Sequence, residues 1–167
     1  FLGTLGNASQ PYSFSRVPKN ALKIARETIA SCINASPEEI FFTSGGTESD
    51  NWALKGILKT NESQTVITSQ IEHHAILHTC ASIEQVGNKV IYLPVDRNGI
   101  VDTNTLQEAL VNKVALVSVM YANNEIGSLE PIHELCNIAH RNGAKFHTDA
   151  VQAVGHVKID VKEIGVD

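Results

Sequence analysis

The first residues that could do chemistry lie in a short polar loop with two adjacent glycines. Gly45 and Gly46 follow an apolar run, and Thr47 and Glu48 then open a segment with helical spacing. Glycines let the backbone approach an oxyanion closely, and the free N–H groups of a helix start favour a phosphate. The loop lacks the G-K-[ST] ending of a Walker A loop and the spacing G-x-G-x-x-G. Phosphate binding and an ordinary tight turn therefore both remain open.

Histidines supply the second candidate group. His73 follows a predicted strand and opens a predicted helix, where an imidazole can lie against a flat aromatic ligand or transfer protons near neutral pH. His74 and His78 are four residues apart and would share one helix face, so a metal pair must be considered. There is no third ligand at a useful spacing, and the glutamate of H-E-x-x-H is missing. The sequence favours surface or core histidines, and we predict no metal site.

Amides and carboxylates follow two further apolar runs. Asn123, Asn124 and Glu125 either cap their own loop or form a hydrogen-bonding platform for a ligand, and composition does not choose between these roles. Asp149 follows the other run, with Gln152 three residues later. A buried carboxylate needs a cationic or donor partner, and a protonated heteroaromatic nitrogen is a suitable one. The alternative is that Asp149 caps the next helix.

The segments between these groups alternate between helical and strand-like spacing. Helices are predicted at residues 18–33, 47–58, 73–86, 103–110 (capped by Asp102 or Thr103) and 132–141. Strands are predicted at residues 40–43, 65–68, 89–93, 114–120 and 145–148. Apolar strands that alternate with helices favour an α/β fold with a mainly parallel sheet flanked by helices. Ligands of such sheets bind at the carboxyl ends of the strands, where each candidate group is predicted to lie.

Composition argues against several other classes. The 167 residues are 43% hydrophobic and 19% charged, which suits a soluble globular domain. The net charge of -5 and the absence of a Lys/Arg cluster argue against nucleic-acid binding, and neither a membrane span nor a signal peptide is recognisable. Cys32, Cys80 and Cys136 are far apart and lie in apolar helical stretches. We therefore expect buried, reduced thiols and a cytoplasmic protein.

Four motifs, taken in order, resemble those of the cysteine desulfurases, which belong to the aminotransferase class V group of fold-type I pyridoxal-phosphate enzymes. They are FTSGGTESDN at 42–51, EH at 72–73, NNEIG at 123–127 and HTDAVQ at 147–152. Residues 6–16 look like a degenerate form of the family segment G-N-P-S-S-x-H-S-F-G-R, with Gln10 and Tyr12 replacing its Ser and His. The resemblance covers essentially the whole chain and implies the large, cofactor-binding domain.

The resemblance implies roles at the phosphate and the ring face of pyridoxal 5'-phosphate. Gly46 and Thr47 would hold the phosphate through backbone N–H and hydroxyl groups. His73 would stack on the pyridine ring and take part in proton transfer, which makes it the candidate catalytic residue of this chain.

The resemblance also implies roles at the ring edge. Asp149 would pair with the protonated ring nitrogen and keep the ring an electron sink. Gln152 and Asn124 would bond the side of the phenolic oxygen. Asn124 is preferred over Asn123 because of its spacing to Asp149.

The implied reaction converts L-cysteine to L-alanine and passes sulfur on as a persulfide of a loop cysteine. The sulfur would serve iron–sulfur cluster assembly, through a scaffold protein as acceptor, or thiolation of transfer RNA. Family members are homodimers. The alternatives are a selenocysteine lyase, another class V aminotransferase, or a structural or dimerisation fragment without chemistry of its own.

The sequence also departs from the family. The family's Schiff-base lysine, in an S-x-H-K motif, would fall beyond residue 167, and the nucleophilic cysteine further still. Residues 1–167 are therefore expected to be a partial large domain, cut at both ends and without the C-terminal small domain. Such a chain is expected to hold the cofactor weakly and not to turn over L-cysteine.

Overall fold

The computed structural model describes residues 7–60 and 62–167, and it divides the chain into two compact units. The first unit comprises the residues up to Phe42 together with Ile159–Val161, and the second comprises Thr43–Lys158 and Lys162–Asp167. The six predicted site residues all belong to the second unit. Gly6, at the start of the segment that resembles the family motif, lies outside the described residues.

The first unit is built around one long helix. Helix α1 (Arg16–Ile33) follows the short 3-10 turn η1 (Ser13–Ser15), and η2 (Pro37–Glu39) comes after it. The helix ends at Asn34, whose left-handed φ of 57° is a common helix stop. The helix predicted at 18–33 is confirmed and begins two residues earlier.

The strand predicted at residues 40–43 is wrong, because these residues form no regular element. The Nε of Arg26 donates to the carbonyl oxygen of Ile40 at 2.9 Å, and its guanidinium lies 5.2 Å from the ring centre of Phe42. A strand needs a neighbouring backbone for its hydrogen-bond ladder. Here a side chain takes the Ile40 carbonyl, and an apolar composition alone cannot reveal that.

The expectation for Cys32 is also wrong, because this cysteine is exposed, whereas Cys80 and Cys136 are buried as expected. Helix α1 buries Ala30 but leaves Ile24 and Ile29 exposed. Within the first unit the helix packs against the short turns η1 and η2, which cover little of its apolar face.

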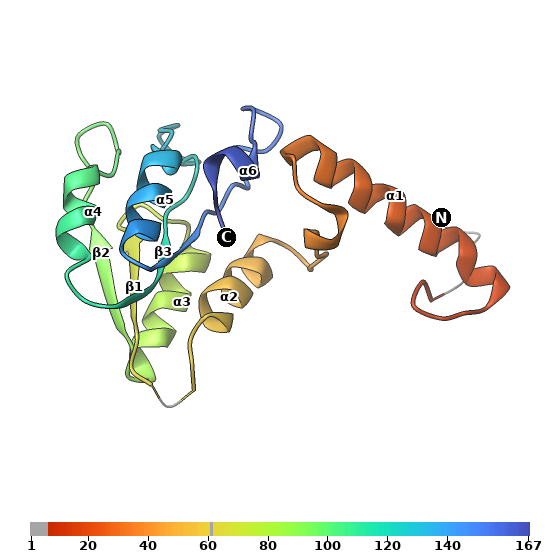
Figure 1. Ribbon diagram of the computed structural model, residues 1–167, viewed down its shortest axis with the longest axis horizontal. Coiled ribbons are helices and arrows are strands. Elements are labelled where there is room, and N and C mark those ends of the chain that lie inside the picture. The colour runs from red at the N-terminus through yellow and green to blue at the C-terminus, as the bar shows by residue number, and fades with distance from the viewer. Residues whose placement is uncertain (1–6, 61) are drawn as a thin grey trace. The chain divides into compact units, whose positions relative to one another are not determined.

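Four strands of the second unit form one parallel sheet in the order β2-β1-β3-β4 (Figure 1). They are β1 (Thr65–Ser69), β2 (Lys89–Leu93), β3 (Val114–Ser118) and β4 (Lys145–His147). The predicted mainly parallel sheet is confirmed, and β3 and β4 end slightly earlier than expected. Since the strands run in one direction, their carboxyl ends share one edge of the sheet.

The predicted helices of the second unit are confirmed within three residues at each end. They are α2 (Gly46–Gly56), α3 (His74–Gln85), α4 (Thr103–Ala109) and α5 (Ile132–Arg141). Asp102 is the cap of α4, since its carboxylate accepts from the N–H of Thr105 at 3.2 Å. The four-residue helix α6 (Val161–Ile164) was not predicted, because so short a helix shows no periodicity. Among the described residues no helix is long and apolar enough to cross a membrane.

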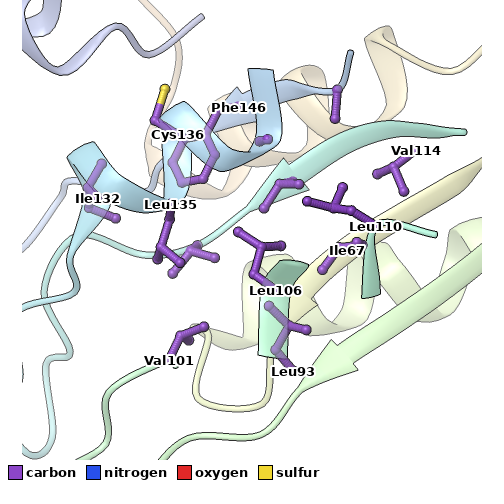
Figure 2. Close-up of a cluster of buried hydrophobic side chains, with 14 residues drawn as sticks. Ile67, Leu93, Val101, Leu106, Leu110, Val114, Ile132, Leu135, Cys136 and Phe146 are labelled. Atoms are coloured by element: carbon purple, nitrogen blue, oxygen red, sulfur yellow. The ribbon is translucent and has the colours of Figure 1, made fainter. Parts of the chain in front are cut away.

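Helices cover both faces of the sheet because successive side chains of a strand point to opposite faces. Ile67 belongs to a buried cluster with Leu106 of α4 and Leu135 of α5, which Figure 2 shows. Its neighbour Val66 belongs to a second cluster, with residues of α2 and α3 such as Leu54. The sheet is thus held rigidly between two helical layers, with its carboxyl edge left for the loops.

Candidate functional site

A cavity of about 190 Å³ lies at the carboxyl edge of the sheet. Its walls come from the start of α2 and from the segments that follow β1, β3 and β4. The lining residues are Gly46, Thr47, Asp50, His73, Met120, Ala122, Asn124, Asp149, Val151 and Gln152. The structure therefore brings together all six predicted site residues. A larger surface hollow of about 690 Å³, lined in part by Lys55 and Lys59, contains none of them.

The first wall of the cavity is the beginning of α2. Gly45 is the residue before the helix, and its carbonyl accepts from the N–H groups of Glu48 and Ser49. Within the described residues no hydrogen bond engages the N–H groups of Gly46 and Thr47. Free N–H groups at a helix start form an anion site, so this wall can hold a phosphate or carboxylate.

Contacts of Ser44 and Val151 determine which groups and how much space this wall offers to a ligand. The N–H and the hydroxyl of Ser44 both donate to the carboxylate of Glu48, each at 2.6 Å, and these bonds lower the pKa of Glu48. The Ser44 N–H is thus already used. A Cβ on Gly46 would lie 3.2 Å from a methyl of Val151, which is a tight contact. Glycine at this position keeps the gap between α2 and Val151 open.

The second wall is His73, which is the N-cap of α3. Its Nδ1 accepts from the N–H of Ala75 at 3.2 Å, so the ring is tethered and Nε2 carries the proton when the imidazole is neutral. The neighbouring His74 and His78 share a helix face as expected, with ring centres 5.4 Å apart. The described residues contain no group of three His, Cys, Asp or Glu that could hold a metal ion.

The two asparagines after β3 have different roles. Asn123 is buried, and its Oδ1 accepts from the N–H groups of Glu125 and Ile126 while its Nδ2 donates to the carbonyl of Ile71. Its amide is therefore used within the loop. Asn124 is exposed and lines the cavity. The loop-capping interpretation is therefore confirmed for Asn123, while a ligand-binding role of Asn124 stays a prediction.

Asp149 follows β4 and is only partly buried. Its Oδ1 accepts from the N–H of Val151 at 2.9 Å, and its backbone carbonyl accepts from the N–H of Tyr121. It thus caps a turn rather than a helix. Within the described residues its other carboxylate oxygen has no hydrogen bond, so Asp149 keeps an acceptor for a ligand. Gln152 lines the same cavity three residues later.

Sequence reasoning gave no role to Asp50, a buried carboxylate that also lines the cavity. It lies four residues after Gly46, and residues at this spacing share one face of a helix. This spacing could have indicated that Asp50 faces the same cavity as Gly46. Its Oδ1 lies 3.8 Å from Nε2 of His147, whose Nδ1 is 2.9 Å from the hydroxyl of Ser118. Burial, and then the charge of Asp149, raise the pKa of Asp50 to about 7. Burial lowers the pKa of His147 to about 4, so this imidazole is neutral at neutral pH.

A second buried carboxyl supports the cavity from below. Oε1 of Glu72 accepts from the hydroxyl of Ser69 at 2.5 Å and from the N–H of Met120 at 2.9 Å. Glu72, which directly precedes His73, thereby links the end of β1 to the segment after β3. Among the described residues its Oε2 has no hydrogen-bond partner. Burial outweighs these hydrogen bonds and raises the pKa of Glu72 to about 8, so the group is protonated at neutral pH.

Comparison with known proteins places this fold and cavity in a family. The family model described as aminotransferase class-V matches residues 2–167. The chain belongs to the aminotransferase class-V family. Among its curated relatives, a protein named cysteine desulfurase IscS from Clostridium botulinum (strain Kyoto / Type A2) is 52% identical over 100% of this chain. A protein of the same name from Methanosarcina thermophila is 51% identical over 97% of it.

The class-V chain spans less than half the length of these relatives, 43% and 41% respectively. Solved structures agree with the fold. A structure described as SspA in complex with cysteine superposes with a TM-score of 0.95 at 36% identity, over 98% of this chain and 48% of that one. A structure described as a NifS-like protein gives a TM-score of 0.94 at 35% identity, over 99% and 46%.

Proposed function

We propose that the protein containing this chain is a pyridoxal-phosphate-dependent cysteine desulfurase that converts L-cysteine to L-alanine. The sulfur leaves as a persulfide for iron–sulfur cluster assembly or transfer-RNA thiolation. The observation that carries the proposal is the gathering of all six predicted residues around one cavity. Relatives of about 50% identity that are named cysteine desulfurases support it. A homodimer, a scaffold protein as sulfur acceptor and a cytoplasmic location belong to the same proposal.

The phosphate end of the cofactor fits the start of α2. The N–H groups of Gly46 and Thr47 are free of internal partners, and the hydroxyl of Thr47 adds a third donor. Gly46 leaves space that a side chain would narrow against Val151. The chain carries a net charge of -5, so these local donors rather than long-range attraction must hold the phosphate.

The ring of the cofactor fits the remaining walls. The free acceptor of Asp149 would hold the proton of a ring N–H, and the amides of Asn124 and Gln152 would bond the phenolic oxygen. The tethered imidazole of His73 would lie on the ring face with the proton of Nε2 available for transfer. When bound, the cofactor supplies an electron-accepting ring that stabilises negative charge at the substrate carbon. The chain's own residues would orient that ring in the cavity.

The whole protein gives the direct test of the activity. With L-cysteine it should form alanine and an equal amount of persulfide, which an added thiol reductant releases as sulfide for assay, and Asp149→Ala should remove this activity. Asp102→Ala, at the cap of α4 and outside the cavity, is the matched control and should retain it. Alanine from selenocysteine but none from L-cysteine would favour the selenocysteine lyase alternative instead.

The isolated chain provides a second test, because it contains no S-x-H-K motif. We expect a weak change in the absorbance of pyridoxal phosphate that is lost in Asp149→Ala, and no alanine. The covalent anchor and the sulfur-attacking cysteine are proposed to lie in the rest of the protein. Alanine above the level of free cofactor, or a lysine of this chain reduced onto the cofactor by borohydride, contradicts this.

A further inference from the structure

Two carboxylates line the same cavity, and only Asp149 has a role in the proposed function. The side chain of Asp50 is 6% exposed, and within the described residues no hydrogen bond reaches its carboxylate. Its ion-pair contact is His147, at 3.8 Å. A buried carboxylate without donors is costly unless it is protonated or meets a cation. The structural surroundings therefore leave the Asp50 carboxylate available to a proton or a ligand.

Within residues 7–60 and 62–167, the charged groups found around Asp50 include no lysine or arginine that could offset its negative charge. On α2, Glu48 is engaged with Ser44, and Lys55 lines the other hollow. From α3, which packs against α2, Cys80 is a neutral thiol whose pKa burial raises to about 12. The cavity itself is lined by His73 and by no lysine or arginine. Two carboxylates that line one cavity without such a cation repel each other, and this favours the protonated form of the more deeply buried one, Asp50.

His147 and Ser118 form a chain of contacts that ends at the Asp50 carboxylate. The hydroxyl of Ser118 lies 2.9 Å from Nδ1 of His147, and Nε2 faces Asp50. Because burial lowers the pKa of His147 to about 4, the imidazole does not take the proton from Asp50. Burial and the charge of Asp149 raise the pKa of Asp50 to about 7, which agrees with a proton resident on Asp50.

We propose that Asp50 and Asp149 form a proton-sharing carboxylate pair that makes this cavity selective for a ligand with a basic ring nitrogen. The inference rests on the proposed function and assigns Asp50 within it. At pH values below the raised pKa of Asp50, about 7, the empty cavity holds a proton on Asp50. When a neutral ring nitrogen faces Asp149, that proton leaves Asp50 and is bound by the nitrogen, so both carboxylates become ionised against one cation. A ring of the same shape without the nitrogen leaves the proton on Asp50.

The ligand-free chain tests the pair directly. Carbon-13 NMR of labelled aspartate side chains should show one carboxyl that titrates near neutral pH and is absent from Asp50→Asn. In Asp149→Asn it should titrate about one pH unit lower, because the neighbouring charge is gone. Asp102→Asn, outside the cavity, should leave it unchanged. An Asp50 carboxyl that titrates in the ordinary acidic range, unaffected by Asp149→Asn, overturns the inference.

Two ligands separate this inference from the proposed function. Pyridoxal phosphate should ionise Asp50 at about pH 6.5, whereas its analogue with a benzene ring in place of the pyridine should bind without ionising it. If both bind and the Asp50 carboxyl responds alike, the cofactor site stands and the proton-sharing role is refuted. If neither ligand perturbs residues of the cavity, the cofactor proposal and the ligand selectivity both fail, even if Asp50 titrates as expected in the ligand-free chain.

Discussion

Replacement of Glu72 by glutamine should change the pH dependence of stability. In the folded chain burial raises the pKa of Glu72 from an ordinary 4.5 to about 8. The folded state therefore binds more protons than the unfolded state between these pH values. Stability contributed by the protonated group is complete below about pH 4.5 and is lost as pH rises through about 8. Glutamine does not titrate, so the Glu72→Gln variant should become more stable relative to the wild type as pH rises.

The size of this effect follows from the shift. One pKa unit corresponds to about 1.4 kcal/mol, so the change in pKa from 4.5 to about 8 corresponds to about 5 kcal/mol in all, of which at most about 3.5 kcal/mol falls between pH 5 and pH 8. Relaxation around the charged carboxylate reduces this, and we expect a gain of about 1–3 kcal/mol between pH 5 and pH 8. Glutamine keeps an oxygen to accept from Ser69 and Met120, so the tie between β1 and the segment after β3 survives.

Urea unfolding followed by circular dichroism, at several pH values in this range, measures the difference. Other titrating groups, Asp50 among them, are common to both proteins and largely cancel in the comparison. The control is Glu108→Gln on α4, an exposed position where no pH-dependent gain is expected. Parallel pH profiles for the wild type and Glu72→Gln would refute the burial argument.

Two further predictions concern stability. Leu135→Ala should lower the free energy of unfolding, measured with urea, by about 2–5 kcal/mol, because Leu135 is fully buried between α5 and the sheet. Leu129→Ala, at a half-exposed position, should lower it by less than about 1 kcal/mol. Equal losses in the two variants would contradict the packing. Gly99→Ala and Gly143→Ala should each cost about 1–2 kcal/mol, since both have φ of 75°. They should differ by less than about 1 kcal/mol. At Gly99 a Cβ meets the exposed side chain of Ile126, which can rotate away, and the hydroxyl of Ser128 at 3.3 Å, which needs to shift only slightly; a much larger cost at Gly99 would show that these side chains are held in place.

The sequence predicted the fold well where local pattern and tertiary context agree. The buried strands β1 to β4 have apolar side chains on both faces, so their type and direction could be inferred. Residues 40–43 are also rich in apolar side chains, but the carbonyl of Ile40 accepts from Arg26, and composition does not show what lies beside a segment. The exposed Cys32 was mispredicted for the same reason, because burial depends on what covers a helix face.

The sequence predicted which residues would line the candidate site, but not which interactions each of them makes. Strand ends and the glycine pair located the cavity from the sequence alone. Asn123 and Asn124 are adjacent amides, and only their hydrogen bonds reveal that the first is used by its own loop. The support by Glu72 depends on contact with Met120, 48 residues away in the chain. Contacts at such separation leave no periodic signal.

Amide NMR of the isolated chain, titrated with pyridoxal phosphate, tests the central claim most directly. The N–H resonances of Gly46 and Thr47 should shift most, because their free groups are proposed to bind the phosphate, and Asp149→Ala should weaken the binding. The hollow lined by Lys55 and Lys59 is the internal competitor, since its ammonium groups attract phosphate by charge alone. Shifts confined to that hollow, with Gly46 and Thr47 unchanged, would contradict the account.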